Sequence, residues 1–302
     1  MHRSSAPARI ITTLVTLLAV PIALVAFSSG GAPWLRAVHR RMTLEMAMAQ
    51  VPPASLGLLA LGVALMVVVG LLGIWSSAGL LASSLYAVAF TAAAMVPSLT
   101  EELTRALMGV LPGQLGLDGG YGLNYGAMAV VTLTLPALGG VLAIARRRPV
   151  RSLALAVVGM ILSPVLLLAG TVLMVVGIAG GLSSQVLAGF ATLQFSPTAV
   201  VLIGAVLIVL GVAVAVVAPY ALLVPALVAI LLTVVFLTPL PFGLLVPGQI
   251  GGLPTLDATS TFQVMLMTGA GPGLAALFVA FTVAVAVVRR SSDRPSRPVA
   301  TS

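Results

Sequence analysis

The sequence predicts an all-α polytopic membrane protein with about eight transmembrane helices, and three observations lead to that prediction. Of the 302 residues, 60% are hydrophobic and only 7% are charged, whereas typical soluble domains are roughly 25% charged. Long apolar stretches without Asp, Glu, Arg or His recur along the chain, and roughly 20 such residues cross a bilayer core of about 30 Å. The arginines lie between and after these stretches. Together these features predict a bundle of two parallel four-helix repeats with both termini in the cytoplasm.

Eight stretches are long and apolar enough, taken in order along the chain: 10–27, 56–74, 79–97, 127–145, 152–179, 198–217, 221–238 and 264–288. The fifth is long and contains Pro164, so we expect this helix to tilt or kink. The first has an alternative interpretation as a signal peptide, because Arg3 and Arg9 precede it and the small residues 28–31 follow it. Its apolar run exceeds the roughly 7–15 residues usual in a signal peptide, which favours a retained span.

The arginines predict the orientation of these spans. With both ends inside, ten of the fourteen basic residues fall on the cytoplasmic side, as the positive-inside rule requires. We therefore expect Trp75 and Tyr220, in two tight turns, to lie at the cytoplasmic interface. The ten are Arg3, Arg9, Arg146, Arg147, Arg148, Arg151, Arg289, Arg290, Arg294 and Arg297.

Short signatures recur in order and predict an internal duplication, with repeats at 1–150 and 151–290 and a disordered cytoplasmic tail at 291–302. With an even number of spans in each half, the two repeats are parallel. The alternative is that apolar, glycine-rich helices resemble one another by composition alone. The matching landmarks are 112–116 with 247–251, Pro21 with Pro164, Gly30-Gly31 with Gly180-Gly181, Pro53 and Gly62 with Pro197 and Gly204, and Arg146-Arg147 with Arg289-Arg290.

The longer loops, at 28–55, 98–126, 180–197 and 239–263, all fall on the outer face in this topology, and loops commonly carry function. Residues 34–50 have the periodicity of an amphipathic helix, and a second such helix begins at Ser98. These helices either lie in the outer leaflet or cap the bundle. The residues that define the first as an interfacial helix are Trp34, Arg36, Arg40 and Arg41.

A pair of outer-face turns forms the candidate polar site. Gln114 and Gln249 each follow a Pro-Gly turn, and the repeat symmetry predicts that they face one another over a central opening. Asp118 and Asp257 follow in the same two loops. The alternative is that both turns are simply solvated.

Several chemistries lack the residues they need. The chain has no cysteine and no lysine, which excludes disulfides, thiol catalysis, Schiff-base chemistry and a P-loop lysine. We expect no metal and no cofactor, because His2 and His39 fall on opposite sides of the membrane and no acidic residues complete a ligand set. Charge-free spans argue against ion-coupled transport. The short cytoplasmic turns offer no docking loop for an ATPase, and we expect no nucleic-acid partner.

These features favour a non-enzymatic protein of the bacterial plasma membrane that acts through its outer loops as a scaffold, assembly or partner-binding subunit. Its expected partners are the lipid bilayer and a membrane or envelope protein. One alternative is a passive or lipid-handling transporter with a pathway between the repeats. Another is an enzyme acting on envelope lipids through outer carboxylates, either Asp118 with Asp257 or Glu101 with Glu102. The use of arginine as the sole long basic residue is typical of a GC-rich bacterial genome.

Overall fold

The chain folds into a bundle of helices in a computed structural model, which describes residues 5–39, 49–96, 99, 102, 105, 125–146, 153–182, 197–237 and 269–292. These residues contain helices and turns and no strand. The longer elements are α1 (Ala6–His39), α3 (Pro53–Leu72), α5 (Ser84–Met95), α8 (Tyr125–Ala145), α9 (Leu153–Leu182), α10 (Pro197–Ala213), α11 (Leu223–Leu237) and α13 (Ala270–Ser292). Short elements are α4 (Ala78–Ala82), η3 (Val214–Val216) and η4 (Pro219–Leu222).

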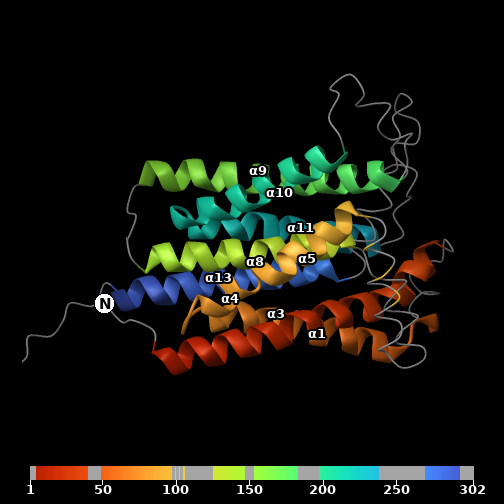
Figure 1. Cartoon of the computed structure of the whole chain (residues 1–302), viewed down its shortest axis with the longest axis horizontal. Coiled ribbons are helices and arrows are strands. Elements are labelled where there is room, and N and C mark those ends of the chain that lie inside the picture. The colour runs from red at the N-terminus through yellow and green to blue at the C-terminus, as the bar shows by residue number, and fades with distance from the viewer. Residues whose placement is uncertain are drawn as a thin grey trace, which may run out of the picture.

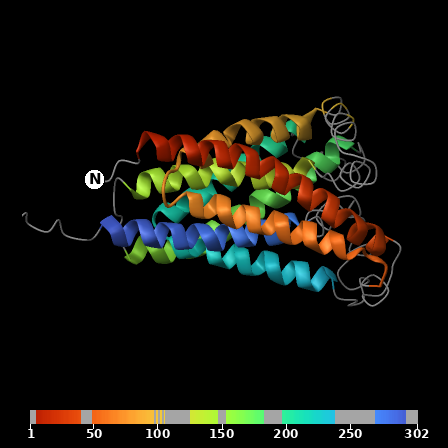
Figure 2. The ribbon, with the colours of Figure 1, turned by 90° about the horizontal axis from the view of Figure 1, so that it is seen from below.

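The helices run back and forth along one common axis (Figure 1, Figure 2). Within the described residues, seven helical stretches are long and apolar enough to cross a membrane, and the stretch Pro219–Val234 is apolar but shorter. The start of α1, the end of α13 and the tight turns after α3 and α10 lie at the same end of the bundle (Figure 1). The prediction of a membrane-embedded helical protein is therefore confirmed at this level.

Two helices form the centre of the bundle. In α8 and α13, 67% of the span positions are buried, compared with 28% to 44% in the other five spans. In Figure 1 the pair α9 and α10 lies along one side and the pair α1 and α3 along the other, with α8 and α13 between them. Helix α8 also packs against α10, and α13 against α3.

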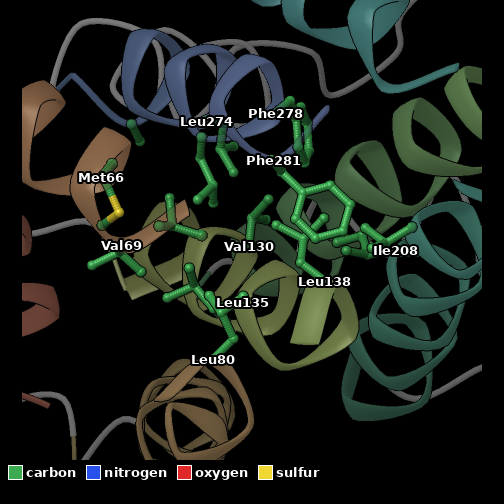
Figure 3. Close-up of a cluster of buried hydrophobic side chains, with 14 of the residues drawn as sticks. Met66, Val69, Leu80, Val130, Leu135, Leu138, Ile208, Leu274, Phe278 and Phe281 are labelled. Atoms are coloured by element: carbon green, nitrogen blue, oxygen red, sulfur yellow. The ribbon is translucent and has the colours of Figure 1, made fainter. Parts of the chain in front are cut away.

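Apolar side chains from these helices form one buried cluster, part of which Figure 3 shows. Phe281 and Leu138 are both fully buried there, as are Met66 and Ile208 from the flanking helices. Close packing of this kind is typical of a protein interior, where few gaps exceed a water molecule. The labelled residues are Met66, Val69, Leu80, Val130, Leu135, Leu138, Ile208, Leu274, Phe278 and Phe281.

The first helix differs from its predicted span. The sequence predicts a span over 10–27 and a separate amphipathic helix from residue 34, whereas α1 is one helix from Ala6 to His39. The small residues that suggested a signal-peptide cleavage site are buried helix-packing positions. A Cβ on Gly30 would lie 2.8 Å from the Ser55 carbonyl oxygen of α3, and the Ser28 hydroxyl donates to the Leu24 carbonyl. Small residues at these positions let α1 and α3 approach closely.

The third and seventh predicted spans are also less regular than expected. Residues 79–97 are divided at Ser83, whose hydroxyl donates to the Leu80 carbonyl over 2.5 Å and replaces a backbone donor. Helix α10 ends at Ala213, and the chain passes through η3 and η4 before α11 begins at Leu223. The η4 segment begins at Pro219, which favours the start of a helical turn.

Candidate functional site

Arg146 joins the end of α8 to the turn that follows α3. Its guanidinium donates hydrogen bonds to the carbonyl oxygens of Gly73 and, over 3.2 Å, of Ile74. The carbonyls at a helix C-terminus lack helical donors and carry partial negative charge. A guanidinium placed there supplies the missing hydrogen-bond donors and offsets the partial negative charge of the carbonyls. Partial burial lowers the pKa of the Arg146 guanidinium from its ordinary value, since desolvation disfavours the charged form.

Arg289 makes the corresponding contact at the end of α13. Its guanidinium donates to the Val216 carbonyl oxygen over 2.6 Å, at the end of η3. The arginine and its acceptor are 73 residues apart here, the same separation as between Gly73 and Arg146. The sequence predicts these two arginines as markers of orientation and as matching positions of the two repeats. The structure also makes them anchors between helices.

Tyr86 links α5 to α1 inside the first half of the chain. Its hydroxyl donates to the Leu17 carbonyl oxygen over 2.5 Å. That carbonyl lies four residues before Pro21, which has no N–H to offer it. Tyr86 therefore supplies a donor that the helix lacks, in a medium where an unpaired carbonyl is costly. Pro21 and Tyr86 are both visible in the sequence, but the hydropathy of the spans does not indicate that they lie together.

An apolar pocket of about 210 Å³ lies between α9 and α11, with α8 and α13 as its floor. The two walls include Pro164 and Leu168 from α9 and Pro225 and Ala229 from α11. On the floor, Thr134 donates its hydroxyl to the Val131 carbonyl, so this polar group is already paired. The pocket is lined almost entirely by hydrocarbon, and the sequence analysis did not predict it.

At the opposite end of the bundle from the two arginine anchors, Trp34 forms a small cluster with Ala37, Val51 and Leu59. Trp34 is 6% exposed, so it packs between α1 and the segment that leads into α3. Among the residues that the structure describes, none bonds to the buried indole Nε1. Arg36, two residues later, is half-buried.

Most of the predicted outer-face residues lie outside the part of the chain that the structure describes, so their predictions stay untested. Glu102 is described and is exposed. Trp75 and Tyr220, in the tight turns, are 66% and 55% exposed, as expected of side chains at the interface. Arg290 lies in the last turns of α13. Outside the description are Gln114, Gln249, Asp118, Asp257, Glu101, Arg40, Arg41, Arg147, Arg148 and Arg151.

The described residues contain no group of three or more His, Asp or Glu side chains arranged to hold a metal ion. The chain matches no known family model, no curated protein and no solved structure. A function for this chain therefore rests on the geometry of its own residues.

Proposed function

We propose that this chain is a plasma-membrane protein of eight spans, built as two parallel four-span repeats with both termini cytoplasmic. Three pairs of positions support the duplication, each pair separated by 143 residues along the chain. Arg146 with Gly73 corresponds to Arg289 with Val216. Pro21 corresponds to Pro164, and each lies within the first helix of its half.

The packing of the helices supports the same division. The pair α1 and α3 corresponds to α9 and α10, and the pair α5 and α8 corresponds to α11 and α13. Contacts between the halves also come in matching pairs, because α3 packs on α13 as α10 packs on α8. On this proposal the short apolar helix Pro219–Val234 is the seventh span.

The function we propose is a non-enzymatic scaffold or partner-binding subunit that acts through its outer loops. The supporting observation is the apolar packing between α3, α8, α10 and α13, which buries Met66, Ile208 and Phe281 completely. A solute pathway between the repeats would need an opening through this packing. A closely packed bundle suits a protein that presents loops to a partner.

Two measurements test this proposal. Purified protein in liposomes should release small ions and sugars no faster than protein-free liposomes. Solute flux that disappears when Gln114 and Gln249 are changed to alanine would overturn it. In the native host, a photo-crosslinking amino acid at Leu115, in an outer loop, should form a discrete adduct with one partner protein, whereas one at Trp75 should not. Absence of any such adduct from all four outer loops would contradict the proposal.

The pocket between α9 and α11 supports a second candidate function, the handling of membrane lipid. It opens sideways, since Val165 and Leu168 on its wall are 56% and 51% exposed. In a membrane, side chains exposed on a span face hydrocarbon. Fluorescent lipids in proteoliposomes should then exchange between leaflets faster than in protein-free vesicles, measured by the fraction that an external reductant can quench. An unchanged exchange rate would reject this candidate.

A further inference from the structure

The two halves differ at one set of corresponding positions. In the first half, Tyr86 reaches from α5 to the Leu17 carbonyl beside Pro21. In the second half, the positions 143 residues later are Ala229, Met160 and Pro164. The proline is kept, so the Met160 carbonyl again lacks its helical N–H donor. The tyrosine is replaced by alanine, which can neither fill the space nor donate a hydrogen bond.

The pocket lies at this substitution. Both Ala229 and Pro164 line it, and its volume is about 210 Å³. An apolar cavity of about 150 Å³ is already large enough to take up benzene. The lining is hydrocarbon apart from threonine hydroxyls: Thr171 donates to the Leu167 carbonyl and Thr134 to the Val131 carbonyl, so neither hydroxyl needs a ligand.

The surroundings identify the occupant. Pro164 lies in the span Ala154–Val175, and Ala229 lies in the apolar stretch Pro219–Val234. The side opening at Val165 and Leu168 therefore faces the interior of the bilayer. Hydrocarbon chains of lipids are the molecules at this depth, and they match the lining. We propose that the pocket between α9 and α11 binds one hydrocarbon chain of a bilayer lipid, in the place that Tyr86 fills in the first half. This inference rests on the duplication and deepens the second candidate function.

The test introduces tyrosine, the residue at position 86 in the first half, at the corresponding position 229 in the second half. In Ala229→Tyr, the ring fills the pocket and its hydroxyl can reach the Met160 carbonyl. Leu227→Tyr is the matched control, because it introduces the same side chain on α11 at a residue that is 66% exposed and does not line the pocket. Both variants and the wild type are placed in lipid nanodiscs containing phosphatidylglycerol with a diazirine in one acyl chain. After illumination, mass spectrometry locates the adducts.

The expected result is labelling concentrated at Leu168, Val228 and Leu232 in the wild type and in Leu227→Tyr. In Ala229→Tyr this labelling should fall about tenfold, which corresponds to roughly 1.4 kcal/mol of binding free energy. Even labelling of all lipid-facing residues, such as Ile161 and Leu210, would overturn the proposal. So would undiminished labelling in Ala229→Tyr.

Two further measurements keep the test decisive. If Ala229→Tyr does not fold, as judged by its thermal unfolding, Ala229→Leu fills the pocket with less bulk and should lower labelling in the same direction. The lipid-exchange assay separates the two proposals. Pocket labelling without accelerated exchange supports the lipid site and rejects lipid handling. Accelerated exchange with labelling spread evenly over the spans rejects the site and retains the function.

Discussion

Single polar side chains hold the apolar helices in register. Each donates a hydrogen bond to a backbone carbonyl of another segment, and that carbonyl has no donor within its own helix. Arg146 and Arg289 bind carbonyls at turns on the same end of the bundle, and Tyr86 binds one beside a proline. Apolar packing alone is weakly directional. These hydrogen bonds therefore fix how far one helix can slide along another.

Replacing an anchoring arginine should destabilise the bundle. Arg146→Gln removes a charged donor from two carbonyls, so we expect the free energy of unfolding to fall by about 1–3 kcal/mol. Unfolding in detergent micelles titrated with sodium dodecyl sulfate measures it. Arg105→Gln is the control, since this arginine is exposed, and it should change the value by less than about 0.5 kcal/mol. Equal effects of the two substitutions would show that the contacts to Gly73 and Ile74 do not stabilise the fold.

Removing one hydroxyl tests the proline-linked hydrogen bond. Tyr86→Phe leaves the Leu17 carbonyl without this donor inside the bundle, and we expect a loss of about 1–3 kcal/mol of unfolding free energy. Tyr220→Phe removes a hydroxyl from a side chain that is 55% exposed and should be close to neutral. The same unfolding titration compares them. A neutral Tyr86→Phe would mean that Leu17 finds another donor.

At the scale of helices, α9 and α10 approach one another closely through a pair of glycines. A Cβ on Gly170 would lie 2.7 Å from the Gly204 carbonyl oxygen, and one on Gly204 would lie 2.7 Å from the Gly170 carbonyl oxygen. Both obstacles are backbone atoms, which cannot rotate away. The two glycines thus set the distance between these helices.

Gly170→Ala should push the pair apart and lower the unfolding free energy by about 1–3 kcal/mol, the usual effect of overpacking. Gly140→Ala is the matched control within a helix, because a Cβ there meets nothing within 4 Å. That substitution should be neutral or stabilise the protein by up to about 1 kcal/mol, given the higher helix propensity of alanine. A larger loss of unfolding free energy in Gly140→Ala than in Gly170→Ala would contradict this prediction.

Hydropathy and arginine placement predict the positions of the helices to within a few residues for most spans, such as 127–145 against Tyr125–Ala145. They do not predict that α1 continues to His39, because glycine and serine are typical both of cleavage sites and of close helix contacts. The break at Ser83 depends on a side-chain hydrogen bond that periodicity does not reveal. The sequence does not reveal the pocket, because the pocket depends on how α9 and α11 pack and on Ala229, one small residue among many. For the candidate site at Gln114 and Gln249, the described residues provide no test.

At the scale of the whole molecule, we propose two copies of one four-helix unit. Helix α8 of the first copy and α13 of the second lie at the centre of the bundle. Matching contacts within and between the halves are what an axis along the membrane normal produces for parallel repeats. The two arginine anchors then lie on the same side of the membrane, and the longest connections lie on the other. On the proposed duplication, differences between the halves, such as Tyr86 against Ala229, mark features that only one copy has.

The proposed architecture requires the short helix Pro219–Val234 to cross the membrane. This crossing can be measured directly. Reporter fusions truncated after Leu115 and after Gln249, at corresponding places in the two halves, give the side of the membrane each reaches, with a fusion after Arg148 as the cytoplasmic reference. The account predicts that both the 115 and the 249 fusions report the extracytoplasmic side. If the 249 fusion reports the cytoplasm while the 115 fusion reports outside, the chain crosses the membrane an odd number of times between them and the parallel four-plus-four architecture is contradicted.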